Sequence, residues 1–472
     1  MMDAVGLGRA IASRQLSCAE VMAAFLDHIE AVNPKVNAIV ALQDRGALMG
    51  EARAADAQVQ RGEIVGPLHG FPHAVKDLAW VRGIRSTSGS PILKDFVPAE
   101  DALFVERLRA AGAIFIGKTN TPEFGKGSHT YNPVYGVTRN AYDQVRSAGG
   151  SSGGAAVALA LRMVPLADGS DYGGSLRNPA GWNNVLGFRT SFGVVPVAGP
   201  DVWSPTMGVV GPMARSVADL ALLLSVQAGY DPRAPLSVAG DGARFLAPLE
   251  VDLTGKRIAW LGDFNGFAPY EPGVLEVCRA ALATFEQLGC VVEEAVPDYP
   301  PEPVWQAQLK LRAWQAGSGL VDFYNDPAKR ALMKPEVVFE VESGMQLSAY
   351  EVAQAGVVRS EWSAAVRRLF DRYDYLVAPT AQVFPFAVEE TWPRRIAGQE
   401  MATYHEWMKA VFLITMSGCP ALAVPAGFGP QGLPMGLQIV APVREDMACL
   451  QLGFAYDGAT HWPARRLPPL LT

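Results

Sequence analysis

From about residue 64 onward, short apolar runs alternate with stretches of helical period, and this alternation restricts the chain to few architectures. Strands that alternate with helices favour an α/β fold, with a sheet covered by helices on both faces. The strand-like runs include Ile114–Ile116, Ile258–Leu261, Val291–Val292, Tyr375–Val377, Ala421–Val424 and Leu437–Val440, and the helix-like stretches include 101–111, 154–162, 216–228, 272–288, 350–372 and 443–456.

The N-terminal 62 residues precede this alternation and read as helices. Ser17 and Glu20 have the spacing of a capping box, which predicts a helix that begins there and ends at Asn33-Pro34. A polar, Ala-rich helix is predicted over 46–61. We expect residues 1–62 to pack as helices on the core of a single domain that spans 1–472.

The segment 296–410 is less regular in pattern and carries five of the ten tryptophans. Clustered aromatic residues can form a cap or a pocket over a site, and we interpret the segment as such an excursion within the domain. Ordinary aromatic packing in the core is the alternative explanation.

Charge and cysteine content exclude several classes of partner. Forty basic and 47 acidic residues give a net charge of −7, which argues against a nucleic-acid partner. No apolar stretch reaches the ~18 residues of a membrane helix, so no membrane partner is expected. Five scattered cysteines without a CxxC spacing argue against disulfides and favour a cytoplasmic location. The six histidines show no metal-ligand spacing, and we expect no metal.

Gly112–Thr119 fits the P-loop pattern GxxxxGK[ST], but its surroundings contradict a phosphate site. A P-loop needs a strand that ends at the first glycine and a flexible loop after it. Here a predicted helix precedes Gly112, and the four variable positions read as a buried strand. We therefore reject nucleotide binding.

Residues 149–153, GGSSG, fit the GxSxG pattern of the α/β-hydrolase nucleophile elbow. The residues before the motif read as a loop, whereas that fold requires a strand. Only His405 and His461 follow the motif in sequence. A Ser-His-Asp hydrolase stays open as an alternative.

Three segments together carry residues suited to acyl transfer. Lys76 ends a short apolar run, and burial would lower its pKa enough to make it a base. Ser151 and Ser152 lie in a glycine-rich run that enters an Ala-rich helix, where capping alone does not require so many glycines. In residues 169–175, consecutive amides of a Gly-Gly-Ser turn can converge on an oxyanion, and Ser175 could attack the carbonyl held there.

With these segments, the chain resembles the amidase signature family from about residue 60 to 460. The motifs GGSSGG (149–154) and GSDYGGSLRNPA (169–180) carry the resemblance, and GPLHGFPHAVKDL (66–78), GKTNTPEFG (117–125) and GLPMGLQIVAP (432–442) agree with it. The resemblance implies the amidase signature fold, an α/β fold with a large mixed, mostly parallel twisted sheet covered by helices on both faces. It implies a serine hydrolase of carboxylic amides without a cofactor.

The resemblance also assigns roles. Ser175 would be the acylated nucleophile, Ser151 the serine with a cis peptide bond that bridges it to the base, and neutral Lys76 that base. The other positions are the oxyanion amides of Tyr172, Gly173, Gly174 and Ser175, the substrate-binding positions Gly125 and Ser152, and the loop-organising residues Asp171 and Arg177.

Two departures from the family pattern concern the shape of the site. Tyr172 stands where threonine is usual, and Trp182-Asn183-Asn184 replaces Phe-Cys-Gly. Both changes are expected to place aromatic bulk beside the nucleophile loop. With the tryptophans of 296–410, they favour an aryl or apolar amide substrate, while esters and carbamates are also accessible to the same nucleophile.

Another member of the family supplies a different possible function, the glutaminase subunit of a tRNA amidotransferase. Asn178 stands where that subunit typically has glutamine, and the Trp-rich segment also argues against it. The expected partner is thus a small-molecule amide, and the sequence leaves a homodimer open.

Overall fold

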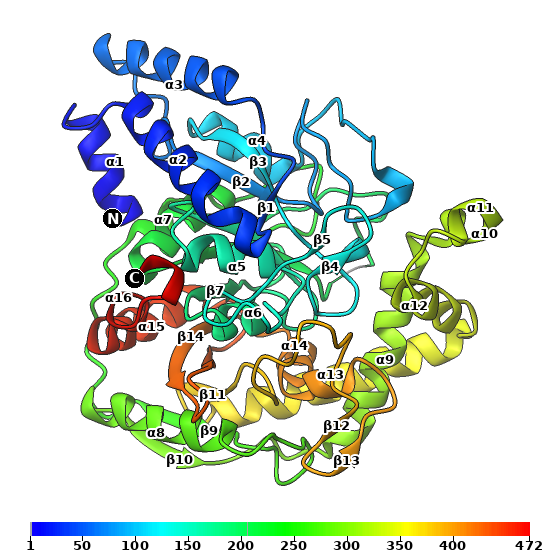
Figure 1. Cartoon of the computed structure of the whole chain (residues 1–472). Helices are drawn as coiled ribbons and strands as arrows, with labels where there is room; N and C mark the ends of the chain where they lie inside the picture. The colour runs from blue at the N-terminus through cyan, green and yellow to red at the C-terminus, as the bar shows by residue number, and fades with distance from the viewer. Residues whose placement is uncertain (1, 205) are drawn as a thin grey trace.

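The computed structural model describes residues 2–204 and 206–472, and within them the central sheet has eight strands (Figure 1). Two neighbouring pairs, β10–β9 and β9–β11, are parallel, and the other five are antiparallel. The predicted mixed sheet is confirmed, but the expectation that it is mostly parallel is wrong. The strand order is β10 (Val291–Glu294), β9 (Arg257–Trp260), β11 (Tyr375–Pro379), β15 (Pro434–Val440), β14 (Ala421–Phe428), β7 (Leu186–Arg189), β8 (Val209–Ala214) and β6 (Ala167–Asp171).

Two of the five antiparallel pairs, β7–β8 and β14–β15, join successive strands with no described helix between them. Only residues 429–433 separate β14 from β15, and the Gly429 amide donates to the Leu433 carbonyl at 2.9 Å across the turn. So short a connection reverses the chain, whereas a parallel pair needs a crossover of a dozen residues or more. The strand runs were predicted, but their connections decide the direction.

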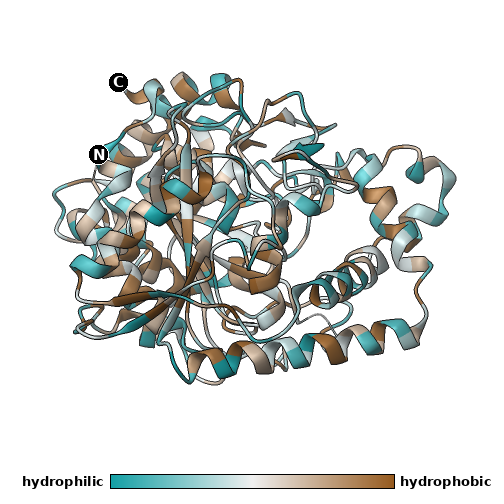
Figure 2. Cartoon of the chain, turned by 90° about the horizontal axis from the view of Figure 1, so that it is seen from below, coloured by the Kyte–Doolittle hydropathy of each residue, from teal (hydrophilic) through white to brown (hydrophobic). Residues whose placement is uncertain are grey.

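Helices surround this sheet, and its middle strands are buried along their length. Every residue of β7, β11 and β15 is buried, which requires cover on both faces. Figure 2 shows apolar strands inside and hydrophilic stretches on the outer helices. The remaining helices of this body are α4 (Leu103–Ala110), α5 (Gly153–Ala160), α6 (Arg177–Trp182), α7 (Val217–Gln227), α8 (Val274–Gln287), α14 (Lys409–Ser417), α15 (Asp446–Thr460) and α16 (Trp462–Arg465). None of the described helices combines the length and apolar character needed to cross a bilayer.

The N-terminal region forms three helices, α1 (Ala4–Ala12), α2 (Cys18–Val36) and α3 (Arg45–Gln60). The predicted capping box of Ser17 and Glu20 is present. The predicted stop at Asn33-Pro34 is wrong, because α2 continues through Pro34 and ends before Asn37 in the left-handed conformation. Asn33 Oδ1 accepts the amides of residues 38 and 39, so its side chain orders the exit from the helix.

A second sheet lies beside these helices and positions the site. Its order is β1 (Ile39–Val40), β3 (Ile114–Thr119) and β2 (Pro72–Lys76), with β2 and β3 parallel. Every residue of β3 is buried, so the P-loop match is a core strand, as predicted. Two hairpins complete the strands, β4 (Tyr131–Asn132) with β5 (Gly136–Val137) and β12 (Arg395–Ile396) with β13 (Gln399–Glu400).

The segment 296–410 is more regular than its sequence suggests. It contributes sheet strand β11 and five helices, several of which extend to one side of the molecule in Figure 1. Four of its five tryptophans are buried, so much of the aromatic content is core packing. The helices are α9 (Pro301–Ser318), α10 (Val321–Asn325), α11 (Pro327–Arg330), α12 (Pro335–Met345) and α13 (Ala349–Phe370).

Candidate active site

Lys76 is the last residue of β2, and its amino group lies among three serine hydroxyls. The side chain is buried, with 1% of the residue exposed. Lys76 Nζ lies 2.8 Å from the Oγ atoms of Ser151 and Ser152 and 2.9 Å from that of Ser170. A primary amine surrounded by hydroxyls can exchange protons with them.

Burial lowers the pKa of Lys76 to about 7, although the carboxylates of Asp168 and Asp171 act in the opposite direction. Desolvation disfavours the ammonium form because burial removes the water molecules that hydrate its charge. Near neutral pH, a large fraction of Lys76 is therefore unprotonated and able to accept a proton.

Ser151 stands at a turn that brings its hydroxyl to Lys76. The Gly150–Ser151 peptide bond is cis. Gly150 is fixed on both sides, because Ser128 Oγ donates to its carbonyl at 2.8 Å and its amide donates to Asn178 Oδ1 at 3.2 Å. A Cβ on Gly150 would lie 2.9 Å from a backbone atom of Ser128, so this turn requires glycine.

Ser175 lies in the loop between β6 and α6 and remains half-buried, which leaves it accessible. The Ser152 amide donates to the Ser175 carbonyl at 3.2 Å, so the two serine segments adjoin. Within the described residues, the Ser175 hydroxyl makes no hydrogen bond. The transfer of its proton to Ser151 therefore stays a proposal.

Asp171 and Arg177 form a buried ionic framework for the nucleophile loop. Asp171 accepts the amides of Gly174 and Leu176 at 2.9 and 3.1 Å, and Arg177 binds both carboxylate oxygens at 3.0 Å. Burial alone would raise the pKa of Asp171, but Arg177 and Arg189 outweigh it and hold the pKa below its ordinary value. Asp171 is thus ionised and fixes the turn.

The oxyanion prediction needs one correction. The Gly174 amide already donates to Asp171 Oδ1, so the amides of Tyr172, Gly173 and Ser175 remain for an oxyanion. A Cβ on Gly173 would lie 1.9 Å from the Phe412 ring. The loop is therefore packed too closely for any other residue there.

The two tentative substrate-binding positions, Gly125 and Ser152, have different surroundings in the structure. A Cβ on Gly125 would lie 3.6 Å from Ser151 Oγ, so Gly125 borders the serine. Ser152 is fully buried and contacts Lys76, so it is not accessible to a substrate in this structure.

Two residues around Lys76 were missed, Asp168 and Ser170 on β6. Asp168 accepts the Lys76 amide at 3.1 Å and contacts His73 Nε2 at 3.0 Å. Alternate residues of a strand face the same side. Positions 168 and 170 are two residues apart, so their side chains face the same side of β6. Recognising residues 167–171 as a strand could therefore have identified both.

His405 and His461 do not support the α/β-hydrolase alternative. His405 Nε2 lies 3.0 Å from Glu340 Oε1 and from Arg312 Nε, and burial lowers its pKa. His461 is exposed at the end of α15. In the described part of the chain, neither histidine bonds to a serine. That part also holds no cluster of three His, Cys, Asp or Glu side chains arranged as metal ligands.

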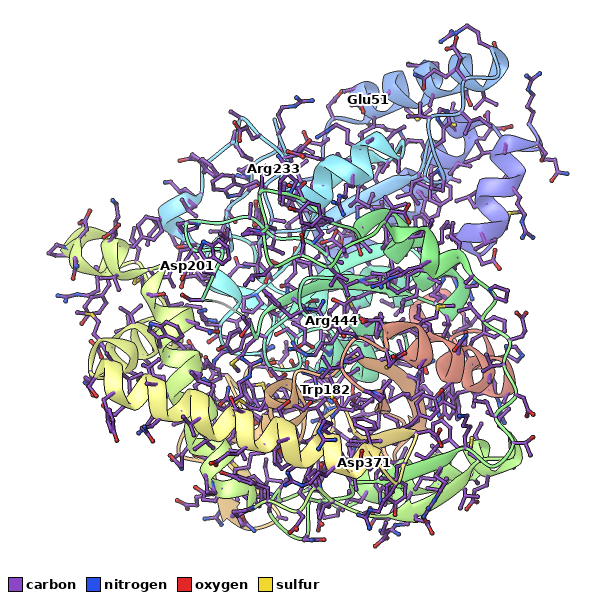
Figure 3. All side chains as sticks on the ribbon, turned by 180° about the vertical axis from the view of Figure 1, so that it is seen from behind. Glu51, Trp182, Asp201, Arg233, Asp371 and Arg444 are labelled. Carbon is purple, nitrogen blue, oxygen red and sulfur yellow. The ribbon has the colours of Figure 1, made fainter. Side chains whose placement is uncertain are left out.

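Trp182 does not shape the site as its position in sequence suggested. It is fully buried, stacks on Trp407 with ring centres 5.2 Å apart, and donates to the Val383 carbonyl. Figure 3 labels it within the body of the molecule. Of the two predicted aromatic neighbours, only Tyr172 reaches toward a cavity.

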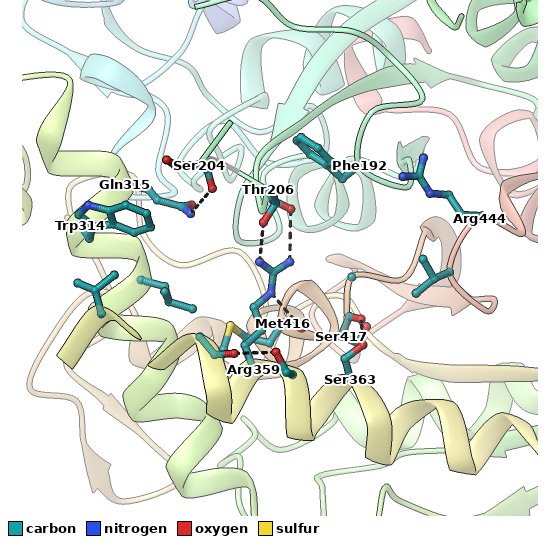
Figure 4. Close-up of a pocket in the computed structure, with 16 residues that line it drawn as sticks. Phe192, Ser204, Thr206, Trp314, Gln315, Arg359, Ser363, Met416, Ser417 and Arg444 are labelled. Carbon is teal, nitrogen blue, oxygen red and sulfur yellow. Dashed lines mark hydrogen bonds between the residues drawn. The ribbon is translucent and has the colours of Figure 1, made fainter. Parts of the chain in front are cut away.

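A cavity of about 650 Å³ lies next to Tyr172 (Figure 4). Tyr172 Oη donates at 3.0 Å to Gln315 Oε1, and Gln315 lines the cavity. None of the three predicted catalytic residues lines it, so it adjoins the serine loop without enclosing it. Half of the lining comes from 296–410. The lining residues are Phe192, Ser204, Thr206, Leu311, Trp314, Gln315, Val352, Gly356, Arg359, Ser360, Ser363, Met416, Ser417, Gly418, Val443 and Arg444.

Comparisons with known proteins agree with this geometry. A family model described as Amidase matches residues 20–450. The chain is 34% identical to an acylamidase of Rhodococcus erythropolis over 98% of its own length and 97% of that protein, and 34% identical to a glutamyl-tRNA(Gln) amidotransferase subunit of Moorella thermoacetica over 96% and 95%. The crystal structure of a bacterial aryl acylamidase of the amidase signature family superposes with a TM-score of 0.91 at 29% identity, covering 98% and 99% of the two chains.

Proposed function

The chain belongs to the amidase signature family of amide hydrolases, and from that premise we propose that it cleaves aryl or apolar carboxylic amides through an acyl-enzyme on Ser175. The observation that carries the proposal is the burial of Lys76 among serine hydroxyls, with no carboxylate of the described residues in contact with its amine. Such a lysine is a base near pH 7.

In the proposed mechanism, neutral Lys76 accepts the proton of Ser151 while Ser151 takes that of Ser175. The Ser175 oxygen forms a bond to the substrate carbonyl carbon. When the C–N bond breaks, Ser151 delivers a proton to the departing amine, since an unprotonated amine leaves poorly. Water then hydrolyses the ester by the same proton path in reverse.

The negative oxygen of the tetrahedral intermediate would be held by the amides of Tyr172, Gly173 and Ser175. Donors fixed before the reaction contribute roughly 3 kcal/mol each to lowering such a barrier. The Asp171–Arg177 framework supports this role because it fixes the loop that carries the amides. No cofactor is needed for these steps.

An aryl or apolar group on the substrate is supported by two observations. Similar proteins include an acylamidase and an aryl acylamidase. The cavity next to Tyr172 has Trp314, Leu311 and Met416 in its lining, which suits an aromatic ring. Esters and carbamates offer the same carbonyl to Ser175 and are expected as further substrates.

A glutaminase subunit of a tRNA amidotransferase is the second candidate, because the chain is also 34% identical to a subunit of such a complex. Here Asn178 Oδ1 accepts the Gly150 amide, and Asn178 Nδ2 donates to Ser128 Oγ at 2.8 Å. That use of Asn178 within the loop supports an independent amidase. Copurification with partner subunits would favour the alternative.

The remaining expectations belong to this proposal. We propose one domain over 1–472, with residues 1–62 as packed helices and 296–410 as the segment that forms the cavity wall. A cytoplasmic location is supported by five cysteines that are all buried thiols. A small amide is the proposed partner, and a homodimer is compatible with it.

The test is a substrate panel with mass spectrometry of the enzyme. Wild type is assayed with aryl amides, aliphatic amides, esters, carbamates and glutamine, and the trapped acyl group is located by peptide mapping. We expect aryl amides to be hydrolysed fastest and the acyl mass to reside on Ser175. Glutamine as the best substrate, or an acyl group elsewhere, contradicts the proposal.

A further inference from the structure

Lys126 differs from the other lysines whose pKa is lowered by burial, because it has no partner within the described residues. Lys76 contacts serine hydroxyls, and Lys118 contacts Asp77 at 3.6 Å. Lys334 Nζ lies 3.6 Å from the centre of the Tyr131 ring. Lys126 is half-buried, and within the described residues no such contact offsets the hydration that its ammonium loses.

Lys126 lies in the loop that borders Ser151. It directly follows Gly125, which borders Ser151, and its amide donates to the Glu123 carbonyl at 3.0 Å. The side chain is half-buried, as Ser175 is. Arg312, whose charge acts on Lys126, lies with its Cζ 5.3 Å from the centre of the Tyr172 ring, in the loop that carries Ser175.

The charges around Lys126 leave it uncompensated. Arg312 and Glu340 act on it from α9 and α12, and these two neutralise each other through a 2.6 Å ion pair. Burial and the Arg312 charge lower the pKa of Lys126 to about 8, while Glu340 opposes them. At pH 7 most of Lys126 is therefore a cation for which the described part of the chain supplies no counter-ion in contact.

We propose that Lys126 binds a carboxylate carried by the substrate and so gives the enzyme a preference for amides with an anionic substituent. This inference rests on the proposed amidase function and names its substrate class more closely. A carboxylate next to the ammonium would supply the missing counter-charge and form a charge-assisted hydrogen bond. Arg312 is less suited to the role because Glu340 already holds it.

The test compares matched compounds that differ in one charge. One pair places the charge on the acyl side, succinanilic acid against N-phenylpentanamide. The other places it on the amine side, 4-acetamidobenzoate against 4-methylacetanilide. Binding is measured by calorimetry in Ser175→Ala, where no turnover interferes, and kcat/KM is measured in wild type.

We expect at least one anionic compound to bind Ser175→Ala about tenfold or more tightly than its neutral partner. In Ser175→Ala/Lys126→Met the ratio should fall to near one, and Lys126→Arg should retain part of it. Lys256→Met removes the same charge at an exposed position just before β9 and should leave the ratio unchanged.

No preference in either pair, or a preference that survives Lys126→Met, overturns the inference. Failure of the proposed function looks different. In that case the compounds bind Ser175→Ala with a Lys126-dependent ratio, but wild type hydrolyses none of the four.

Discussion

Lys76 and Lys118 are both buried on neighbouring strands, yet their surroundings give them opposite roles. In the parallel pairing of β2 and β3, Lys118 aligns with Val75, so its side chain faces away from that of Lys76. Lys118 meets the Asp77 carboxylate at 3.6 Å and also donates to Ser86 Oγ at 3.1 Å and to the Ala79 carbonyl. Among the described residues, Lys76 Nζ makes hydrogen bonds only to oxygen atoms of serines.

In the proposed mechanism, this difference separates a buried base, Lys76, from a buried structural cation, Lys118. Burial lowers the pKa of both lysines. A carboxylate in contact stabilises the ammonium of Lys118, whereas hydroxyls can pass a proton on and provide no fixed charge. The partner, and not burial alone, therefore decides whether such a lysine does chemistry.

The largest expected effect is on activity at Lys76. Lys76→Met removes the base and should lower kcat/KM on the order of 10⁴-fold, as removal of a triad member does. Its free energy of unfolding should change by no more than about 1 kcal/mol, because the loss of the buried amine offsets the loss of its bonds to hydroxyls. Steady-state kinetics and urea denaturation measure both quantities, and a mild loss of activity would refute the assigned role.

The same substitution at Lys118 should have the reverse outcome. Lys118→Met leaves the buried Asp77 carboxylate without its cation and should reduce the free energy of unfolding by about 3 kcal/mol. Most of the activity of the folded protein should remain, because Lys118 makes no described contact with Ser151, Ser152 or Ser175, and its serine partner is Ser86. The double variant Lys118→Met/Asp77→Asn should recover stability, and a lack of recovery would show that the ion pair is not the cause.

The structure brings the predicted Lys76 and Ser151 into contact, whereas it overturns the predicted direction of most of the sheet. Lys76, Ser151 and Ser175 lie in local motifs, which can be recognised from neighbouring residues whatever the direction of the strands. The direction of β14 and β15 depends on a five-residue connection, which alternation of strands and helices does not reveal. Trp182 looked like a pocket residue by its position next to the loop, but only packing against Trp407 shows that it is core.

Other features depended on contacts between distant segments. The Gly174 amide is committed to Asp171, and no pattern of residue types states which amides a carboxylate accepts. Ser170 was within reach of sequence reasoning, since strand period places it on the side of Asp168. Lys126 was not within reach of such reasoning, because its lack of a partner depends on the pairing of Arg312 in α9 with Glu340 in α12.

A pH profile sharpens the comparison further. Lys76 must be unprotonated to accept a proton, and burial places its pKa at about 7, so kcat/KM should fall about tenfold per pH unit below that value. Above it, the rate should reach a plateau. Lys118→Met should show the same acid limb, measured with a neutral amide. A flat profile from pH 5 to 8 would mean that another group is the base.

The smallest expected effect comes from deleting one hydroxyl beside each lysine. Ser170→Ala removes an oxygen 2.9 Å from Lys76 Nζ, and Ser86→Ala removes one 3.1 Å from Lys118 Nζ. Fewer oxygens around Lys76 disfavour its ammonium, so Ser170→Ala should move the acid limb of kcat/KM to lower pH. The plateau should fall by less than about tenfold, since Ser151 still contacts the base. Ser86→Ala should leave the limb in place and lower only the stability, by about 1 kcal/mol. An equal shift in both variants would mean that the acid side of the kcat/KM profile reflects a change in folding and not the protonation of Lys76.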